Sequence, residues 1–413
     1  MGLKSKQNRT IVLPISETIY GLFMTDNDFA HKIISNYIEE IPECFPISIQ
    51  NGYTLNGTTR KSKKVNLRMR KIKTGNVSYR IRASFILPYQ RGRTDEVSNA
   101  MFLVRFGVPF WAIAFVFGHN AMWWYRLFLS LSDYSVVGTT IRDPNQLPQD
   151  ILADEHHIKI RGKKAYVATT VGNDCFLGMD VAVSADEHSL YDSYSVFKEE
   201  ASDLNADYQP DTVNIDGWWA TQNAWKILYP TIAIIECFLH AFLKVRDRAT
   251  KNLKEYFDTA ADKIWNCYRA NSKRALAQQI RRLKEWANKL EDSPMKKNIL
   301  KLCKKKKRWM QHFNSPKAHR TSNMIDRMMR PMKKHARNSQ MFHGKKIKTT
   351  SKNFRAFALL YNFSPSSPKA RIKKGNLNSP AARLNGFTYH ENWLHNLLIS
   401  ASLAGFRHHR NPL

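Results

Sequence analysis

Apolar residues recur along this chain with two different spacings, and the change of spacing divides the sequence into segments. Residues 28–41 place apolar side chains on one helical face, namely Phe29, Ile33, Ile34, Tyr37 and Ile38. From about residue 51 to residue 90 the spacing is that of strands, with turns at Asn51-Gly52 and Asn56-Gly57. We therefore expect residues 1–94 to form a helix followed by a β-rich hairpin segment.

The next segment, residues 95–131, predicts three helices: Asp95–Phe106, Phe110–Phe117 and Asn120–Leu131. Ala114 and Gly118 lie four residues apart where two helices would cross, which is typical of a helix-turn-helix unit. In that unit Arg126 is the charged side chain available to DNA. The alternative is an apolar helical hairpin without DNA contact. Residues 132–150 contain Pro144 and Pro148 and are expected to form a linker.

A membrane span is the other interpretation of this region. No Asp, Glu, Lys or Arg occurs in the 20 residues from Phe106 to Tyr125. Pro109 and the turn residues Gly118, His119 and Asn120 interrupt that stretch, however, and they argue against one continuous helix across a bilayer. We expect no membrane partner.

Residues 151–240 predict the element order βββαβαβ. Three strands fall within Ile151–Val183, a helix within Ser189–Leu204, a fourth strand at Thr212–Ile215 and the last at Ile232–Cys237. The predicted class is α/β, and the order is that of an RNase H-like core.

The remaining chain is predicted to be mainly helical. Residues 241–319 carry two apolar stripes at helical spacing, Leu253, Tyr256, Phe257, Ala260, Ile264 and Trp265, then Leu276, Ile280, Leu283, Trp286 and Leu290. We interpret them as an all-helical insertion, with residues 320–363 as the last part of the core. Residues 364–413 are expected to form an extended arm and a tail helix over Tyr389–Ala404.

The net positive charge of the chain indicates the kind of partner it binds. The chain has 65 Lys and Arg against 34 Asp and Glu, a formal charge of +31 over 413 residues. Such an excess favours nucleic acid first and an anionic membrane surface second. Eight cations occur within fourteen residues of the predicted hairpin, and we expect them to contact DNA phosphates or to form a solvated face: Arg60, Lys61, Lys63, Lys64, Arg68, Arg70, Lys71 and Lys73.

The cysteines and the N-terminal sequence indicate the cellular compartment in which we expect the protein. The five cysteines are scattered and odd in number, so no disulfide framework is implied and a reducing, cytoplasmic setting is expected. The apolar run Ile11–Ile15 is too short for a signal peptide. Cys44 alone cannot form a zinc ribbon in the N-terminal region.

Three aspartates carry the candidate chemistry. Asp154 is expected at the start of the first core strand, Asp216 at the end of the fourth, and Asp326 in the first turns of a helix that opens at Thr321-Ser322-Asn323. Convergence of the three would suit two Mg²⁺ or Mn²⁺ ions, which prefer oxygen ligands and can activate the attacking and leaving oxygens of a phosphoryl transfer. We expect Asp154 to bridge both ions, and Asp216 and Asp326 each to hold one. Taken singly, Asp154 and Asp326 could equally be caps.

The motifs around these aspartates resemble those of DDE-type transposases of prokaryotic insertion sequences. The matching stretches begin at Asp154-Glu155, Asn214-Ile215-Asp216-Gly217, Cys237 with His240, Asn323 through Asp326 to Arg330-Pro331, and Arg383-Leu384-Asn385. The resemblance covers about residues 95–404 and departs from the commonest pattern by having Asp at 326. It implies an enzyme that binds transposon ends as a dimer or larger oligomer, cuts DNA strands and transfers them to target DNA.

Further residues near the motifs have two interpretations each. Cys237 and His240 are expected to be a buried structural pair near the site, since a zinc site would need two more ligands. Arg327, Arg330 and Lys333 are candidate phosphate contacts or a plain helix face. Trp218 and Trp219 could stack on a base or pack under the sheet. The alternative functions are a catalytically inactive, transposase-derived DNA-binding protein and a nuclease of the same fold.

Overall fold

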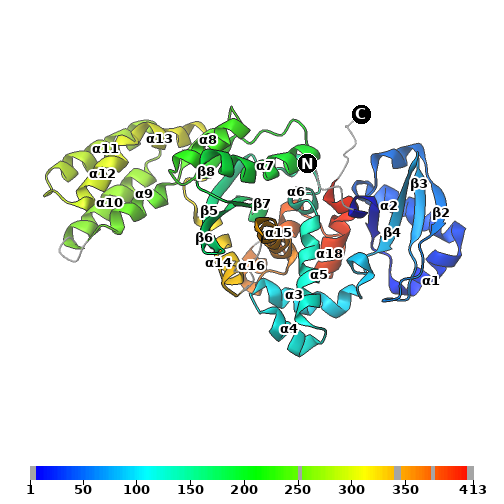
Figure 1. Ribbon diagram of the computed structural model, residues 1–413. Coiled ribbons are helices and arrows are strands. Elements are labelled where there is room, and N and C mark those ends of the chain that lie inside the picture. The colour runs from blue at the N-terminus through cyan, green and yellow to red at the C-terminus, as the bar shows by residue number, and fades with distance from the viewer. Residues whose placement is uncertain (1–5, 250–253, 339–345, 374–376, 407–413) are drawn as a thin grey trace.

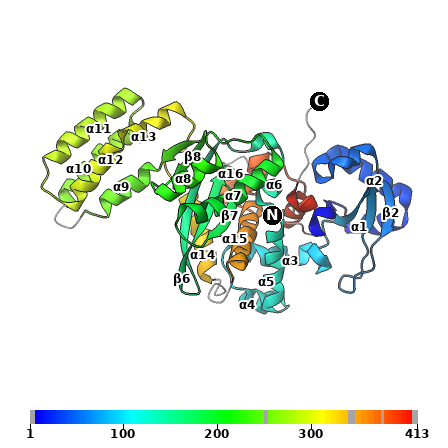
Figure 2. The same ribbon diagram turned by 45° about the horizontal axis from the view of Figure 1, so that its top comes forward.

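The computed structural model describes residues 6–249, 254–338, 346–373 and 377–406. Within them the chain forms three regions that follow one another across Figure 1: an N-terminal β-sheet domain, a central α/β body and a helical lobe. Figure 2 shows the same separation from a second direction. Leu253 of the first predicted stripe lies outside the described residues.

The N-terminal domain is a four-stranded sheet with two helices. Its strands are β1 (Thr10–Leu13), β2 (Thr54–Thr58), β3 (Arg70–Thr74) and β4 (Val77–Ala83), in the order β1-β4-β3-β2. The helices are α1 (Glu17–Thr25) and α2 (Asn27–Glu40). The predicted helix is confirmed as α2 and the strand character of residues 51–90 is confirmed, but the turn predicted at Asn56-Gly57 is wrong, because both residues lie within β2. The sequence analysis missed α1 and also β1, which pairs in parallel with β4 about 70 residues away, Val12 opposite Arg82.

Three helices follow at nearly the predicted positions: α3 (Thr94–Arg105), α4 (Phe110–Phe117) and α5 (Ala121–Ser130). Gly118 separates α4 from α5 with φ 73°, and its carbonyl accepts a hydrogen bond from the indole of Trp124 at 2.8 Å. No helix in the described part of the chain combines the length and the apolar character that crossing a bilayer requires.

The expected linker of residues 132–150 is wrong in its middle part. Helix α6 (Val136–Thr140) is entirely buried there. The Glu200 carboxylate accepts hydrogen bonds from the backbone N–H groups of Val136 and Val137 at 2.6 and 3.0 Å, so it caps the helix from another element. Gly138 packs so closely that a Cβ there would lie 1.9 Å from the carbonyl oxygen of Gly405. This segment belongs to the core.

The central body is built on a five-stranded mixed sheet. The strands are β5 (Asp150–Ile160), β6 (Lys163–Gly172), β7 (Cys175–Ala182), β8 (Thr212–Ile215) and β9 (Ala233–Glu236), with α7 (Glu187–Leu204) and α8 (Trp219–Leu228) between the later ones. The strand order is β7-β6-β5-β8-β9; β5, β6 and β7 are antiparallel, and β5, β8 and β9 are parallel. The predicted order βββαβαβ is confirmed, and the fold is mixed α/β.

The two faces of this sheet bury different helices. Leu177 of β7 belongs to the core shared with α7 and α8, whereas Phe176 belongs to the core that contains α15 (Ile347–Phe363). Phe176 packs edge-on against Tyr361 of α15, with ring centroids 4.9 Å apart. The alternation of neighbouring residues thus places helices on both sides of the sheet.

The helical lobe forms the connection between β9 and the last part of the body. It contains α9 (Phe238–Arg246), α10 (Lys254–Arg269), α11 (Lys273–Asn288), α12 (Pro294–Lys304) and α13 (Lys306–Met310), and it has its own apolar core. Helix α14 (Asn323–Asn338) then returns to the body. The predicted helical character of residues 241–319 is confirmed for the part of this segment that the structure describes.

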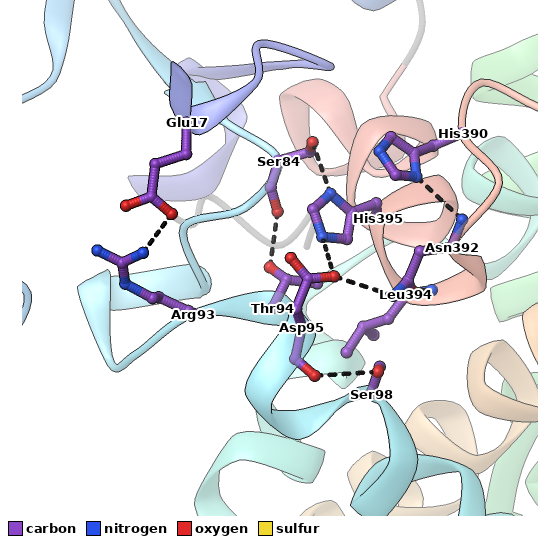
Figure 3. Close-up of polar contacts among 10 residues, drawn as sticks. All are labelled: Glu17, Ser84, Arg93, Thr94, Asp95, Ser98, His390, Asn392, Leu394 and His395. Atoms are coloured by element: carbon purple, nitrogen blue, oxygen red, sulfur yellow. Dashed lines mark hydrogen bonds and ion pairs between the residues drawn. The ribbon is translucent and has the colours of Figure 1, made fainter. Parts of the chain in front are cut away.

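The C-terminal part ties the N-terminal domain to the body. It contains α16 (Pro368–Lys373), α17 (Pro380–Asn385) and α18 (Trp393–Ser400), so the expected extended arm is partly helical. In Figure 3 the His395 ring of α18 lies between Ser84 and Asp95, 2.9 Å from the Ser84 hydroxyl and 3.2 Å from the Asp95 carboxylate. These contacts fix the junction between β4 and α3.

Candidate active site

Asp154 lies inside β5, and the expectation that it begins the strand is wrong. The strand starts at Asp150, and its parallel pairing with β8 covers Asp150–Leu152. Asp154 therefore follows the point where β5 and β8 separate, while it still pairs with Thr169 of β6 on the other side. Asp154 thus lies just beyond the paired part of two parallel strands, a region where α/β sheets commonly place ligands.

Asp216 directly follows β8 on the neighbouring strand. Its Oδ1 accepts a hydrogen bond from the Gly217 N–H at 2.7 Å and lies 3.5 Å from the Lys244 ammonium group of α9. Because β5 and β8 are parallel neighbours, Asp154 and Asp216 leave the same edge of the sheet.

Asp326 reaches this edge through contacts at the start of α14. The Ser322 hydroxyl donates to Asp326 Oδ2 at 2.6 Å, and the Ser322 N–H donates to the Cys237 sulfur at 3.2 Å. The Phe238 N–H also donates to the Arg320 carbonyl at 3.0 Å. These bonds hold the first turn of α14 against the end of β9, which is the parallel neighbour of β8. The helical lobe separates α14 from β9 in the sequence.

Both other aspartates affect the pKa of Asp154. Burial raises the pKa of Asp154 to about 6; the neighbouring His240 opposes this shift, and the negative charges of Asp326 and Asp216 add to it. Asp216 and Asp326 are thus both within electrostatic range of Asp154. Without a cation, the site holds Asp154 in an environment that disfavours its ionised form.

Cys237 and His240 form a pair at the first turn of α9. Contact with Cys237 raises the pKa of His240 to about 9 despite burial, and Asp216 and Asp154 add to the shift. Burial alone would raise the pKa of the Cys237 thiol, but His240 and Ser322 outweigh burial and lower it. The raised pKa favours a protonated imidazole near Asp216 and Asp154. The Cys237 sulfur positions Ser322, which in turn holds Asp326.

Glu236 is a neighbouring carboxylate that the sequence analysis missed. It ends β9 almost fully buried, and Lys305 and Arg308 of the helical lobe form ion pairs with it, the latter at 3.1 Å. A Cβ on Gly217 would lie 2.3 Å from Glu236 Oε1, so the residue after Asp216 has no room for a side chain. An acidic residue closing the apolar run Ile232–Ile235 was the available signal.

Glu155 lies on the opposite face of β5 from Asp154. Its Oε1 accepts hydrogen bonds from the hydroxyls of Tyr194 and Thr221 at 2.8 and 2.6 Å. Burial raises its pKa to about 7, the Thr221 hydroxyl lowers it, and Asp154 raises it further. Glu155 thus anchors α7 and α8 under the site.

The cations predicted on α14 lie along an exposed face. Arg330 is exposed and Lys333 half-buried, whereas Arg327 forms an ion pair with Asp174. His156 of β5 lies close to this face: burial lowers its pKa to about 4, and Lys333 and Arg337 contribute to the shift. A strip of positive charge therefore borders the aspartates.

The two tryptophans after Asp216 differ in their surroundings. Trp218 packs against His157 and Tyr166, with ring centroids 6.3 and 5.7 Å away, so it lies on the surface of the sheet. Trp219 is 68% exposed and remains available for stacking.

The N-terminal cation cluster is concentrated in the loop between β2 and β3. Six of its eight members are exposed: Arg60, Lys61, Lys63, Lys64, Arg68 and Lys73. Lys71 is half-buried. Arg70 departs from the expectation of a surface contact, because it is 3% exposed and its guanidinium donates to the carbonyls of Phe23 and Asp26 and to Asn27. It holds α1 and α2 to the sheet.

Helix α5 presents little surface to a partner. Trp124, Tyr125, Leu127 and Phe128 are buried, and Met122 and Arg126 are exposed. The exposed apolar surface is on α4, where Phe115 is 87% exposed and Trp111 lies beside it on the same helix. The three helices are therefore present, and Arg126 is the exposed cation of α5.

No known protein family matches this chain, and a search of curated proteins also finds no match. Carboxylate oxygens are the ligands that Mg²⁺ and Mn²⁺ take. Burial first, and then the charges of Asp326 and Asp216, raise the pKa of Asp154, and a bound divalent cation would favour its ionised form. The donor set therefore fits such ions. In the described parts of the chain no three His, Cys, Asp or Glu side chains are gathered closely enough to surround one ion.

Proposed function

We propose that this protein is a DNA transposase of the DDE type, in the variant with three aspartates, acting on transposon ends with two divalent ions. The observation that carries the proposal is that Asp216 and Asp326 both act electrostatically on the buried Asp154 and help to raise its pKa. The sheet order β7-β6-β5-β8-β9 supports an RNase H-like core, because it agrees with the strand arrangement of that fold.

Asp154, Asp216 and Asp326 are the residues that would hold the ions. Bound there, the ions would supply charge stabilisation and activation of the attacking group in phosphoryl transfer. The chain's own residues fix the three carboxylates. The Gly217 N–H orients Asp216, and Ser322, itself held by Cys237, orients Asp326.

The charge distribution supports DNA as the substrate. Exposed cations lie in the β2–β3 loop and on α14 next to the site, and the chain carries +31 overall. Two transposon ends must be brought together for strand transfer, so the proposal includes a dimer or larger oligomer on DNA. The helix-turn-helix assignment of α3–α5 belongs to the same proposal, with Arg126 as its DNA contact.

The test uses duplex oligonucleotides taken from the two ends of the DNA element that contains the gene. With Mg²⁺ or Mn²⁺ the protein should nick the ends and join the 3′ ends to target DNA. Asp154→Ala, Asp216→Ala and Asp326→Ala should each abolish both steps and leave binding of end DNA intact. Asp207→Ala, at an exposed position in the turn before β8, is the matched control. Asp326→Glu should retain activity and Asp326→Asn almost none.

The outcomes also separate the alternatives. Cutting without joining would indicate a nuclease of the same fold. End binding without cutting would indicate an inactive DNA-binding derivative. Full cutting by Asp326→Asn would contradict the assignment of the third acid.

A further inference from the structure

A cavity of about 370 Å³ lies in the N-terminal domain, far along the chain from the three aspartates. It is lined by side chains from β1, β4, the β2–β3 loop and the turn after β4, including Thr10, Thr59, Arg60, Arg80, Arg82 and Tyr89. Three of these are arginines, and none of the residues that line the cavity is acidic. Its size is within the range of small-molecule sites.

Arg82 is the unusual member of this set. It lies on β4, is 2% exposed, and none of its three guanidinium nitrogens has a carboxylate partner in the described part of the chain. Arg70 on β3 is equally buried but donates three hydrogen bonds. A buried charge without a partner is strongly unfavourable. The described residues provide no negatively charged partner for Arg82, which indicates that a bound anion supplies it.

The acidic group nearest to this region does not fill that role. Asp133 accepts a hydrogen bond from the Tyr89 hydroxyl at 3.1 Å and forms an ion pair with Lys352 at 2.9 Å. Tyr134 lies beside Arg82: burial raises the pKa of Tyr134, and the charge and hydrogen-bonding contact of Arg82 oppose that shift. A phenol is neutral and does not balance the guanidinium charge, so Arg82 still has no negatively charged partner among the described residues.

The other walls of the cavity add cationic and hydroxyl donors. Burial lowers the pKa of Arg80, and the positive charge of Arg82 lowers it further, so the two guanidinium groups are close enough to repel each other. Thr10 accepts a bond from Arg80 at 3.3 Å and keeps its own hydroxyl proton to donate. Tyr89 and Gln90 both have positive φ, 57° and 51°, a strained conformation that often accompanies binding sites.

We propose that this cavity binds a phosphate group, with Arg82 and Arg80 as its principal ligands and Arg60 at the entrance. Two guanidinium groups and a threonine hydroxyl supply several donors to the oxygens of a tetrahedral anion, and arginine is the side chain best suited to hold phosphate in a bidentate geometry. The phosphate belongs either to DNA or to a phosphorylated small molecule. The inference depends on Arg82 and the cavity and holds whether or not the aspartates cut DNA.

Thermal unfolding of the full-length protein tests the site with inorganic phosphate as the probe, against chloride at equal ionic strength. The Tm of the wild type should rise with phosphate concentration beyond the effect of chloride. Arg82→Met should lose this rise while its Tm without phosphate stays at or above that of the wild type, because an unpaired buried charge has been removed. Lys32→Met, an exposed position on α2, is the charge-matched control and should keep the rise.

Arg82→Lys provides a second variant that keeps the charge but not the planar fork, and its response to phosphate should be weakened. A full phosphate response in Arg82→Met, or a wild-type Tm that phosphate and chloride change equally, would overturn the proposal. A misfolded Arg82→Met, judged by circular dichroism, would also contradict it, since the unpaired charge would then be required for folding without any ligand.

Binding of a duplex oligonucleotide distinguishes the two sources. If the phosphate is that of DNA, Arg82→Met weakens duplex binding more than Lys32→Met does, and inorganic phosphate competes with the duplex. If the ligand is a small molecule, the two variants bind the duplex equally while only Arg82→Met loses the phosphate-dependent rise in Tm. Asp154→Ala should respond to phosphate like the wild type, so failure of the cleavage proposal leaves this one intact.

Discussion

The environment of Asp154 predicts a cost to stability at the residue scale. Its pKa of about 6 lies above the ordinary 3.8, so the folded state disfavours the ionised carboxylate above about pH 6. At pH 8 with a chelator, Asp154→Asn should therefore unfold at a higher temperature than the wild type, by a free energy on the order of 1–3 kcal/mol. Asp143→Asn, on the surface of the segment before β5, is the control. A lower Tm for Asp154→Asn would contradict the electrostatic account.

Ser322 gives a prediction about positioning. Its hydroxyl bonds to Asp326 Oδ2 at 2.6 Å, so Ser322→Ala should leave Asp326 less well oriented without removing any proposed metal ligand. Loss of such an outer contact typically costs 10–100-fold in metal affinity or activity. We expect Ser322→Ala to need roughly ten times more Mg²⁺ for half-maximal cleavage, with the maximal rate largely restored at high Mg²⁺. Ser195→Ala on α7 should match the wild type, and an unchanged Mg²⁺ requirement in Ser322→Ala would remove Ser322 from this role.

His335 predicts a pH dependence of stability. It is buried on α14, its Nε2 lies 2.8 Å from Asn353 Oδ1, and burial lowers its pKa from 6.5 to about 4. Above about pH 6.5 the His335 ring is neutral in both the folded and the unfolded state, so its protonation does not reduce stability there. As the pH falls toward about 4, His335 becomes protonated in the unfolded chain but stays neutral in the folded protein, so the free energy of unfolding falls. His335→Gln should flatten the fall in Tm over this window, whereas His188→Gln at an exposed position should leave it unchanged.

At the scale of elements, Glu200 joins three parts of the body. Its carboxylate caps α6, accepts a bond from Ser135 at 3.1 Å, and forms an ion pair with Arg355 of α15. Glu200→Gln would leave the buried Arg355 without its counter-charge, and removal of one partner of a buried pair costs roughly 3–5 kcal/mol. The urea midpoint should fall accordingly. Glu199→Gln, one residue earlier and exposed, should change it little; equal effects of the two would exclude a specific role for the pair.

The elements also show what the sequence could predict and why the rest escaped. Helix α4 and strand β8 were placed at their observed bounds, because each is a short apolar run between clear breaks. Helix α6 was taken for a linker, since the group that caps it, Glu200, lies about 60 residues later. Helix α15 is buried on most sides, with Asn353, Arg355 and Asn362 among its buried residues, and so it lacks a single apolar stripe.

The same limit applies to the candidate site. The three aspartates were identified from short motifs, but the position of Asp154 inside β5 depends on where β8 stops pairing, which is a tertiary feature. Glu236 and Arg82 were missed because a charged residue in or beside an apolar strand is ordinarily expected to reach solvent. In both cases the strand order decides what each side chain meets.

For the whole molecule, the net charge predicts salt-dependent DNA binding. A protein that makes six to ten phosphate contacts loses roughly 10³–10⁵ in affinity between 50 and 200 mM salt. The exposed β2–β3 loop should provide part of this, because it lies apart from the ion pairs of the body and projects from the N-terminal sheet. Replacing Lys61, Lys63 and Lys64 by Gln should therefore reduce the slope of log K against log salt by about 2 to 3.

The matched control removes the same charge from the helical lobe, by replacing the exposed residues Arg282, Lys284 and Lys289 of α11 and its C-terminal end by Gln. If the loop contacts phosphates directly, its variant changes the slope and the control leaves it near the wild-type value, as measured by fluorescence anisotropy from 50 to 200 mM salt. Equal changes in both variants would mean that the general positive field, rather than contacts of the loop, attracts DNA, because a long-range field depends on total charge and not on which region carries it.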